Sequence, residues 1–527
     1  MDLTEAVAST RASTRPALPD GAPTRRNFPW ATVGMGFVLF LAVVVRFATG
    51  SALWLDEAQT VNIARLPLDD MIEALRHDGA PPLFYVLLHG WMSVFGDGDL
   101  SVRFLPGLFG VAALPLVWLA GRRLGGPTVA WSALLLLATS PFAVRYATEA
   151  RMYSMVVVLV LVGYLAVTEL LERPTSRRAA VGVALVTGAL LLTHYWALYL
   201  LFVVGVGLMV LARGSSPSKE GARRGLVAMA LGSLAFLPWL PAFIYQAGHT
   251  GTPWGGVGRL RSMVDTLFHF SGGYSEPGLF LGMITYGLIG LALFGRAVDG
   301  RRIEIDLRTL PGGRRLAFVG YGTLAVAVLA TVVGRSAFAV RYASVMFPTV
   351  ILLAALGTTL LLDRRVRHAV LAVAVVFGFW AIAPNVFGDR TSAGRVAAAL
   401  QEGVQPGDVV AYCPDQLGPS VSRLLPDGLG AEHLTFPRAT PPQLVDWVDY
   451  AKVNKAADPE PFAQMLLERA GPTGTVWVVW APGYRTFKDK CQGLLGNLDL
   501  ARRNNTRPVK LPSKNFEKPA LIRFPPQ

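Results

Sequence analysis

The sequence predicts a polytopic α-helical membrane protein with a small soluble α/β domain at its C-terminal end. Of its 527 residues, 52% are hydrophobic and only 16% are charged, whereas about a quarter of the residues in soluble domains are charged. The apolar residues recur in runs of about 18 to 20, each long enough to cross roughly 30 Å of hydrocarbon as a helix. These observations exclude a soluble enzyme, a coiled coil and a disordered chain.

The net charge of +14 comes from basic residues in short loops between the apolar runs. Such residues gather on the cytoplasmic side of membrane proteins, so the excess indicates topology and not a nucleic-acid partner. The basic clusters fall in alternate loops, at residues 122–123, 173–178, 213–224, 296–315 and 364–367. They predict a multi-pass protein of the cytoplasmic (plasma) membrane with its N-terminus in the cytoplasm and its C-terminal domain outside.

The first element is a polar segment, residues 1–28, which has no cleavable signal pattern and is expected to be a disordered cytoplasmic tail. Residues 29–387 are then expected to form the transmembrane domain. About eleven spans are expected there, at residues 30–49, 102–120, 128–144, 152–171, 179–193, 195–212, 225–244, 278–295, 316–334, 343–362 and 369–387.

The exterior side carries segments that are longer than simple loops, namely residues 50–101, residues 245–277 and the tail after the last span. Function is therefore expected on this side. The stretch 81–95 opens with two prolines and is too short to span easily, so we expect an interfacial or re-entrant helix.

The composition becomes that of a soluble domain in residues 388–527. Strand-like runs at 408–412 and 475–480 and helical stretches at 394–401 and 461–469 predict an extracytoplasmic α/β domain. The two cysteines of the chain, Cys413 and Cys491, both lie in it. An oxidising exterior favours a disulfide between them; the alternative is two unpaired buried thiols.

Two adjacent carboxylates, Asp56 and Glu57, follow the first span within the exterior segment 50–101. A carboxylate beside the bilayer surface is well placed to act as a general base on a lipid-linked head group. The alternative is a hydrated pair that caps the helix beginning near Glu57, since Asp is a favoured N-cap residue.

A second group, His77 and Asp78, precedes the Pro81-Pro82 turn in the same segment. An imidazole and a carboxylate at this place would supply a corner for a divalent cation or a phosphate, because hard cations prefer carboxylate oxygens. The alternative is an ordinary turn followed by a helix start.

Several motifs, taken in order, resemble those of the GT-C glycosyltransferases. They are similar in particular to the branch of protein O-mannosyltransferases and aminoarabinose transferases, which use polyprenyl- or dolichyl-phosphate sugars. The resemblance covers about residues 30 to 385 and departs from the family at Ala80, where a His is common. The motifs are Trp54-Leu55-Asp56-Glu57, Asp78 to Tyr85, Arg103 to Pro106, Arg145 to Ser154, Thr193-His194-Tyr195 and Arg341-Tyr342.

The resemblance implies a role for each matching residue. Asp56 would be the catalytic carboxylate that deprotonates the acceptor hydroxyl, with Glu57 supporting it. His77 and Asp78 would help to hold a divalent metal, Mg²⁺ or Mn²⁺, or the donor phosphate. The residues that would bind the lipid phosphate are Arg341, Tyr342, Arg151, Tyr153 and His194, and Glu149 and Arg103 complete the site. For the arginines the alternatives are snorkelling at the membrane edge or helix capping, and for Glu149 a salt bridge to Arg145 or Arg151.

The expected function is inverting transfer of a sugar, mannose or a pentose, from a polyprenyl-phosphate donor to an extracytoplasmic glycan, lipid or protein acceptor. A composition rich in Ala, Val, Gly and Arg suggests a bacterial cell envelope as the setting, with membrane lipids as neighbours. One alternative is a transporter or lipid flippase, which the scarcity of ionisable residues in the spans disfavours. Another is a non-catalytic envelope assembly protein that keeps the fold, which the Asp-Glu pair disfavours.

Overall fold

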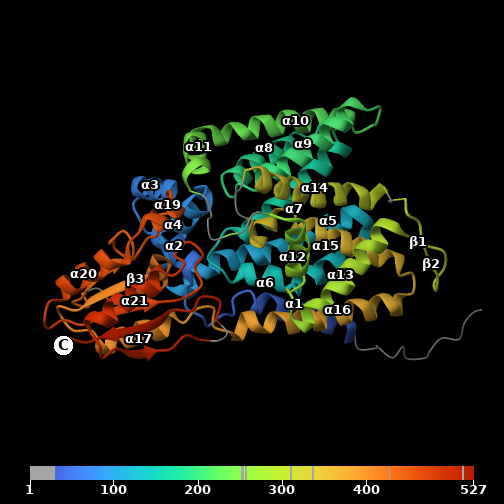
Figure 1. Cartoon of the computed structure of the whole chain (residues 1–527). Helices are drawn as coiled ribbons and strands as arrows, with labels where there is room; N and C mark the ends of the chain where they lie inside the picture. Colours follow the sequence, from blue (N-terminus) through green and yellow to red (C-terminus); the bar gives the residue numbers. More distant parts are fainter. Residues whose placement is uncertain are drawn as a thin grey trace, which may run out of the picture.

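The computed structural model describes residues 30–250, 255, 258–308, 311–334, 338–426, 428–512 and 515–526. The expected cytoplasmic tail, residues 1–28, lies outside the described residues. A bundle of helices lies beside a smaller α/β part that contains the C-terminal residues (Figure 1).

The bundle consists mainly of apolar helices, joined in places by short 3-10 turns. The 3-10 turns are η1 (Leu234–Trp239), η2 (Val340–Val345) and η3 (Thr358–Leu360), and a small hairpin is formed by β1 (Gly295–Ala297) and β2 (Ile303–Ile305). The helices are α1 (Trp30–Val44), α5 (Asp99–Ala138), α6 (Pro141–Ala147), α7 (Tyr153–Glu172), α8 (Arg177–Leu191), α9 (Ala197–Arg213), α10 (Lys219–Ser233), α11 (Leu240–His249), α12 (Leu260–Phe270), α13 (Glu276–Phe294), α14 (Pro311–Val333), α15 (Phe347–Gly357) and α16 (Arg364–Phe387).

Helix α5 contains a break that divides it into two helices. Gly125 and Gly126 have non-helical backbone angles, with φ −157° and +78°. A φ of +78° suits glycine because it has no Cβ. Gly121, before the break, lies against Ala130, after it. A Cβ added at Gly121 would meet backbone atoms at 2.9 Å. The two halves therefore pack closely and overlap the separate spans expected at 102–120 and 128–144.

Helix α15 lies at the centre of the bundle. It is apolar on every side and ten of its eleven residues are buried, as expected of a helix surrounded by others. It packs against α5, α13 and α14, and its side chains belong to the largest apolar core of the described residues.

Six helices within the described residues are long and apolar enough to cross a membrane, among them α7, α13 and α16. Four shorter apolar helices accompany them, including α4 (Leu83–Phe95), which covers the stretch expected to be interfacial or re-entrant. The chain is thus a multi-pass helical protein. Each expected span overlaps a helix, but the total of eleven stays a prediction.

Three helices lie within residues 50–98, namely α2 (Leu55–Ala64), α3 (Leu68–Asp78) and α4, beside the α/β part (Figure 1). Side chains of α2 attach it to the C-terminal residues. The Gln59 amide both accepts from the Val445 N–H (2.9 Å) and donates to the Val445 carbonyl (3.0 Å). Asn62 donates to the Gln443 carbonyl (2.7 Å). The segment that carries the Asp-Glu pair is therefore held by the C-terminal part.

The C-terminal part has a five-stranded sheet in the order β4-β3-β5-β7-β6. Strand β3 is parallel to β4 and β5, whereas β7 is antiparallel to both of its neighbours. The strands are β3 (Val409–Cys413), β4 (Glu432–Thr435), β5 (Val476–Trp480), β6 (Thr506–Val509) and β7 (Ala520–Phe524). The helices are α17 (Ala393–Gly403), α18 (Gly418–Ser422), α19 (Tyr450–Ala456), α20 (Pro459–Ala470) and α21 (Lys490–Ala501), with one 3-10 turn, η4 (Asp415–Leu417).

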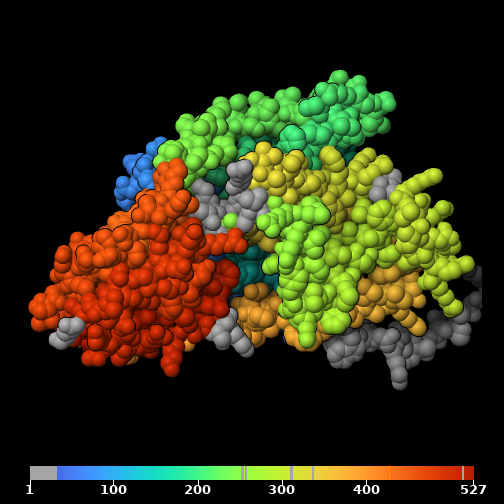
Figure 2. Space-filling model, viewed as in Figure 1, coloured from blue at the N-terminus to red at the C-terminus, as the bar shows by residue number. Residues whose placement is uncertain are grey.

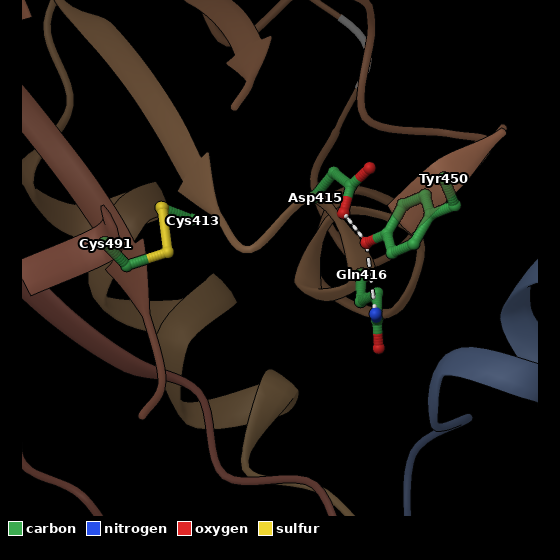
Figure 3. The surroundings of a disulfide bond; sticks show 5 residues. All are labelled: Cys413, Asp415, Gln416, Tyr450 and Cys491. Atoms are coloured by element: carbon green, nitrogen blue, oxygen red, sulfur yellow. Dashed lines mark hydrogen bonds between the residues drawn. A yellow bond between two sulfur atoms is a disulfide. The ribbon is translucent and has the colours of Figure 1, made fainter. Parts of the chain in front are cut away.

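Helices cover both faces of this sheet, because successive strand residues point to opposite sides. Val409 and Ala411 of β3 pack with α20 and α21 on one face. Val410 and Tyr412 pack with α17 and α18 on the other. This burial on both faces explains why β3 and β5 are continuous apolar runs. A disulfide joins Cys413 at the end of β3 to Cys491 of α21 (Figure 3).

Candidate active site

Asp56 lies in the first turn of α2 and forms an ion pair with Arg341 of η2. The Asp56 Oδ2 and Arg341 Nη2 atoms are 3.0 Å apart, and the two side chains are 15% and 16% exposed. The helix begins at Leu55 and its N-cap residue is Trp54. The alternative that Asp56 or Glu57 caps this helix is therefore wrong, and the Asp56 carboxylate remains available at the edge of a cleft.

Two aromatic rings lie beside the guanidinium of Arg341. Its Cζ atom is 5.8 Å from the centre of the Trp54 ring and 5.5 Å from that of Tyr342. Such cation–π contacts fix a planar guanidinium and leave its edge available for anions. The sequence-predicted residues Arg341 and Tyr342 thus lie together with Asp56.

Arg151, which precedes α7, forms a second cationic group near Asp56. Its Nη1 atom donates to the hydroxyls of Thr60 (2.7 Å) and Tyr85 (3.3 Å). Its buried Nε atom has no hydrogen-bond partner within the described residues. Because an unsatisfied buried donor is costly, Arg151 is suited to receive an acceptor such as a phosphate oxygen.

Asp78 lies beside Arg151 and Tyr85. Its carboxylate accepts from the Tyr85 hydroxyl (2.8 Å) and from the Gln59 amide (3.3 Å). Burial raises the pKa of Asp78, and the nearby Arg151 opposes that rise. Asp78 therefore orients Tyr85, which in turn contacts Arg151.

His77 has a different set of neighbours, because it faces the C-terminal part. Its Nδ1 atom is 3.0 Å from Asp446 Oδ1 and its carbonyl accepts from the Trp447 N–H (3.2 Å). Within the described residues, no group of three His, Cys, Asp or Glu side chains is arranged to hold a metal ion. His77 and Asp78 do not fit a shared metal site, so no step below uses a metal there.

His194 and Tyr153 form an aromatic wall next to Tyr342. The His194 ring centre is 5.3 Å from that of Tyr342 and 5.8 Å from that of Tyr153. The His194 Nδ1 atom accepts from the Trp196 N–H (3.1 Å), and burial together with the cationic Arg151 and Arg341 lowers its pKa to about 3. His194 is therefore neutral near pH 7 and would offer a phosphate a hydrogen bond but no charge.

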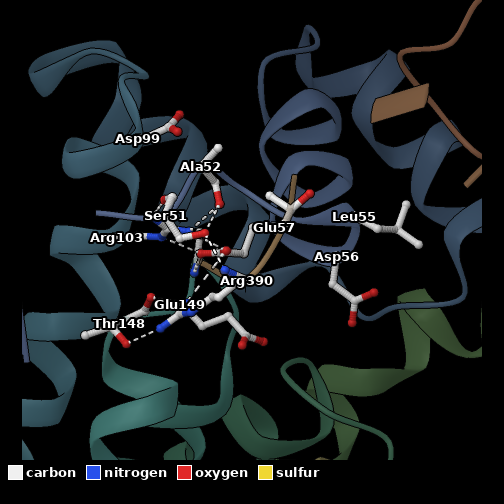
Figure 4. A network of polar contacts seen from close by, with 12 residues as sticks. Ser51, Ala52, Leu55, Asp56, Glu57, Asp99, Arg103, Thr148, Glu149 and Arg390 are labelled. Atoms are coloured by element: carbon white, nitrogen blue, oxygen red, sulfur yellow. Dashed lines mark hydrogen bonds and ion pairs between the residues drawn. The ribbon is translucent and has the colours of Figure 1, made fainter. Parts of the chain in front are cut away.

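Glu57 is buried and points away from Asp56 (Figure 4). Arg103 holds both of its oxygens, at 2.7 and 2.6 Å, and the Ala150 N–H donates to Oε1 (3.0 Å). Arg390 lies 3.8 Å away. Burial alone would raise the pKa of Glu57, but Arg103 and Arg390 hold it below its ordinary value. Glu57 and Arg103 therefore hold the loop in place.

Glu149 lies close to the same buried network. Its Oε2 atom is 3.1 Å from Arg145 Nη2, the salt bridge considered above as the alternative to a catalytic role. Burial raises the pKa of Glu149, against the effect of Arg145. This arrangement supports the turn between α6 and α7 that presents Arg151.

A cleft of about 370 Å³ opens at Asp56 and Arg341 and is walled by both parts of the chain. The bundle side contributes Trp54, Leu55, Asp56 and Arg341, and the C-terminal side contributes Gln416, Trp447, Ala481 to Arg485 and Phe516 to Lys518. The surface is also hollowed between the C-terminal part and helices α12 and α13 (Figure 2). Sequence reasoning missed the C-terminal wall, because no motif there marks these residues.

A sequence profile of the family described as dolichyl-phosphate-mannose-protein mannosyltransferase matches residues 79–241. No curated protein matches the whole sequence significantly.

Two solved structures of ArnT from Cupriavidus metallidurans have a similar fold. The apo structure is 14% identical, with a TM-score of 0.58. The structure bound to undecaprenyl phosphate is 13% identical, with a TM-score of 0.55. Each match covers 94% of this chain and 98% of ArnT. The chain therefore shares the fold of ArnT, and residues 79–241 are similar to the mannosyltransferase family, in agreement with the resemblance inferred from the motifs.

Proposed function

We propose that the protein transfers a sugar, mannose or a pentose, from a polyprenyl-phosphate donor to an acceptor outside the cytoplasmic membrane. The observation that carries the proposal is the Asp56–Arg341 pair, which puts a carboxylate and a cation 3.0 Å apart at the edge of a cleft. A transferase of this kind requires a base for the incoming hydroxyl and positive charge for the departing phosphate.

Arg341 and Arg151 are the groups that would receive the lipid phosphate. Both carry guanidinium groups, whose planar donors match phosphate oxygens, and both lie near Asp56. The ArnT structure with undecaprenyl phosphate supports a lipid phosphate as the ligand of this fold. Tyr153, Tyr342 and neutral His194 would line the same pocket.

The reaction is a direct displacement at the anomeric carbon. The acceptor oxygen attacks from the side opposite the phosphate while its proton passes to the Asp56 carboxylate. The bond between the anomeric carbon and the phosphate oxygen breaks, and its electron pair leaves with the polyprenyl phosphate. Arg341 and Arg151 stabilise the negative charge that develops on this leaving group, and the anomeric configuration inverts.

Arg341 would also control when Asp56 becomes active. In the structure its guanidinium binds the Asp56 carboxylate, with 3.0 Å between Nη2 and Oδ2. A donor phosphate would compete for the same guanidinium donors. The Asp56 carboxylate would then be released from Arg341 to meet the acceptor hydroxyl only when the donor is in place, which disfavours wasteful activation of water.

The acceptor would enter through the cleft, so that the C-terminal part contributes to its recognition. Trp447, Tyr484 and the exposed Arg485 belong to this wall. Aromatic rings and an arginine are suitable neighbours for a polar, hydroxyl-rich acceptor. The plasma-membrane location and the exterior position of this wall are part of the proposal.

The proposal is tested by release of free polyprenyl phosphate from labelled polyprenyl-phosphate mannose, pentose and aminopentose donors. Purified protein is incubated with each donor and an envelope extract as the source of acceptor. Release from one donor, with label appearing in the extract, supports transfer and identifies the sugar. No release from any donor, combined with movement of labelled lipid across vesicle membranes, would contradict the proposal and support a flippase.

A further inference from the structure

The helix that carries Asp56 lacks a cap from its own sequence. Helix starts leave backbone N–H groups without partners, and a Ser, Thr, Asn or Asp normally accepts one of them. The N-cap residue of α2 is Trp54, which makes no side-chain cap hydrogen bond. This is a weakness at the place where the proposed base must be held still.

Glu517, from the segment before β7, supplies the missing acceptor. Its Oε1 atom accepts the Leu55 N–H at 3.1 Å, across a separation of 462 residues. Leu55 directly precedes Asp56, so this bond acts on the backbone next to the proposed base. A carboxylate at this end of a helix also interacts favourably with the helix dipole.

Glu517 is itself firmly held. It is 3% exposed, and its Oε2 atom accepts from the Thr391 hydroxyl at 2.5 Å. Its backbone N–H donates to the Arg390 carbonyl at 2.9 Å, and the Thr391 hydroxyl in turn accepts the Ala393 N–H at 3.0 Å. Its position therefore depends on the C-terminal part being folded and docked.

Arg390, whose carbonyl accepts the Glu517 N–H, also contacts residues around α2. The Arg390 N–H donates to Ser51 Oγ (2.8 Å), and its guanidinium donates to the Thr148 carbonyl (2.6 Å). It lies 3.8 Å from Glu57 (Figure 4). The C-terminal part thus fixes the start of α2 from two sides.

We propose that Glu517 is a positioning residue that caps α2 from the C-terminal part and thereby orients Asp56 for catalysis. The inference rests on the proposed function of Asp56. It makes docking of the C-terminal part a requirement for the chemical step and not only for acceptor binding.

The ionised carboxylate is the better cap. All of its neighbours donate, namely the Leu55 N–H, the Thr391 hydroxyl and the Ser420 hydroxyl. A protonated Glu517 would have to point its own O–H donor toward one of these donors, which is unfavourable. Burial raises the pKa of Glu517 to about 7, opposed by its bonds to Thr391, Ser420 and Leu55.

Other titratable or charged groups surround Glu517 and contribute to any pH dependence. They are Asp56 on α2, Tyr484 after β5, Arg390 before α17, and Lys518 next in the chain. Variants of Glu517 are therefore needed to assign a pH-dependent step to it.

The test compares wild type with Glu517→Ala, which removes the acceptor, and Glu517→Gln, which keeps one amide oxygen for the Leu55 N–H. Glu468→Ala, at an exposed position of α20, is the matched control. For each protein, kcat and the donor KM are measured with the polyprenyl-phosphate sugar that the wild type uses. Hydrogen exchange of the peptide covering residues 51–62 is measured without any ligand.

The proposal predicts a kcat about tenfold lower or more for Glu517→Ala, with the donor KM changed by less than about twofold, because orientation of the base is lost. Glu517→Gln should lose about threefold or less, and its kcat should lack the fall that the wild type shows below about pH 7. Exchange over residues 51–62 should be faster in Glu517→Ala and unchanged in Glu468→Ala.

An unchanged kcat and unchanged exchange in folded Glu517→Ala would overturn the proposal, and so would an effect on KM alone. If Glu517→Ala does not fold, the pH profile of Glu517→Gln decides: a wild-type profile contradicts the positioning role. Absence of transfer by the wild type would instead refute the proposed function, and the exchange measurement would still decide whether Glu517 caps α2.

Discussion

Arg341 of η2 and Asp56 of α2 meet in an ion pair with 3.0 Å between Nη2 and Oδ2, although they belong to segments far apart in the sequence. Because each is about one-sixth exposed and borders the cleft, the pair is accessible to a substrate.

Replacing Arg341 with Lys should weaken donor binding, because Lys keeps the charge but lacks the planar set of donors. We expect the donor KM to rise about tenfold in Arg341→Lys and further in Arg341→Ala. Arg395→Lys, at an exposed position of α17, is the control. Equal KM values in all three proteins would show that Arg341 does not bind the phosphate.

Replacing Glu57 with Ala should destabilise the protein strongly. The change would leave the buried guanidinium of Arg103 without its carboxylate, and removing one partner of a buried pair costs about 3–5 kcal/mol. Glu73→Ala removes an exposed carboxylate paired with Arg76 and should cost less than about 1 kcal/mol. Thermal unfolding in detergent measures both; similar midpoints would contradict the structural role given to Glu57.

Removing the disulfide should destabilise the C-terminal part. The bond closes a loop with a sequence separation of 78 residues, which in the chain-entropy model contributes about 4 kcal/mol. The double variant Cys413→Ser/Cys491→Ser should unfold at a lower temperature, as should reduced wild type. Reducing agent should have no effect on the double variant, and an equal effect on both proteins would contradict the prediction.

Asp415 should make stability depend on pH. Burial raises its pKa from the ordinary 3.8 to about 7, although its carboxylate accepts a hydrogen bond from Tyr450 (Figure 3). The folded protein therefore binds this proton more tightly than the unfolded chain. Its contribution to stability is fully present below about pH 4 and is lost as the pH rises to about 7.

Asp415→Asn removes this titration, so the unfolding temperature of the variant should rise relative to that of wild type between pH 5 and pH 8. The exposed Asp458, whose carboxylate accepts from the Glu460 N–H, provides the comparison Asp458→Asn. A constant difference between wild type and Asp415→Asn over this range would show that Asp415 does not titrate there.

The helical elements could be predicted because they depend on local sequence. A run of apolar residues specifies a span wherever it lies in the chain, and the paired glycines at 125 and 126 divide α5 where two spans were expected. The continuous apolar runs of β3 and β5, which are buried on both faces of the sheet, are likewise a local pattern.

The division of roles between Asp56 and Glu57 could not be predicted from their adjacency. It depends on Arg103, which lies 46 residues away, and on Arg390 from the start of the C-terminal part. The different positions of His77 and Asp78 could not be predicted for a similar reason, because Asp446 and Tyr85 attract the two side chains to different places. Trp447, Tyr484 and Glu517 form a wall of the cleft because the C-terminal part packs against the rest of the chain. No sequence motif marks such packing.

The central claim is that Asp56 acts as the base in sugar transfer. It is tested most directly by the rate of polyprenyl phosphate release at saturating donor, measured for wild type, Asp56→Asn and Asp70→Asn, the last at an exposed position of α3. The account predicts that Asp56→Asn loses about 10²-fold or more while still binding donor, and that Asp70→Asn retains the wild-type rate. A folded Asp56→Asn protein that releases polyprenyl phosphate at the wild-type rate would contradict it.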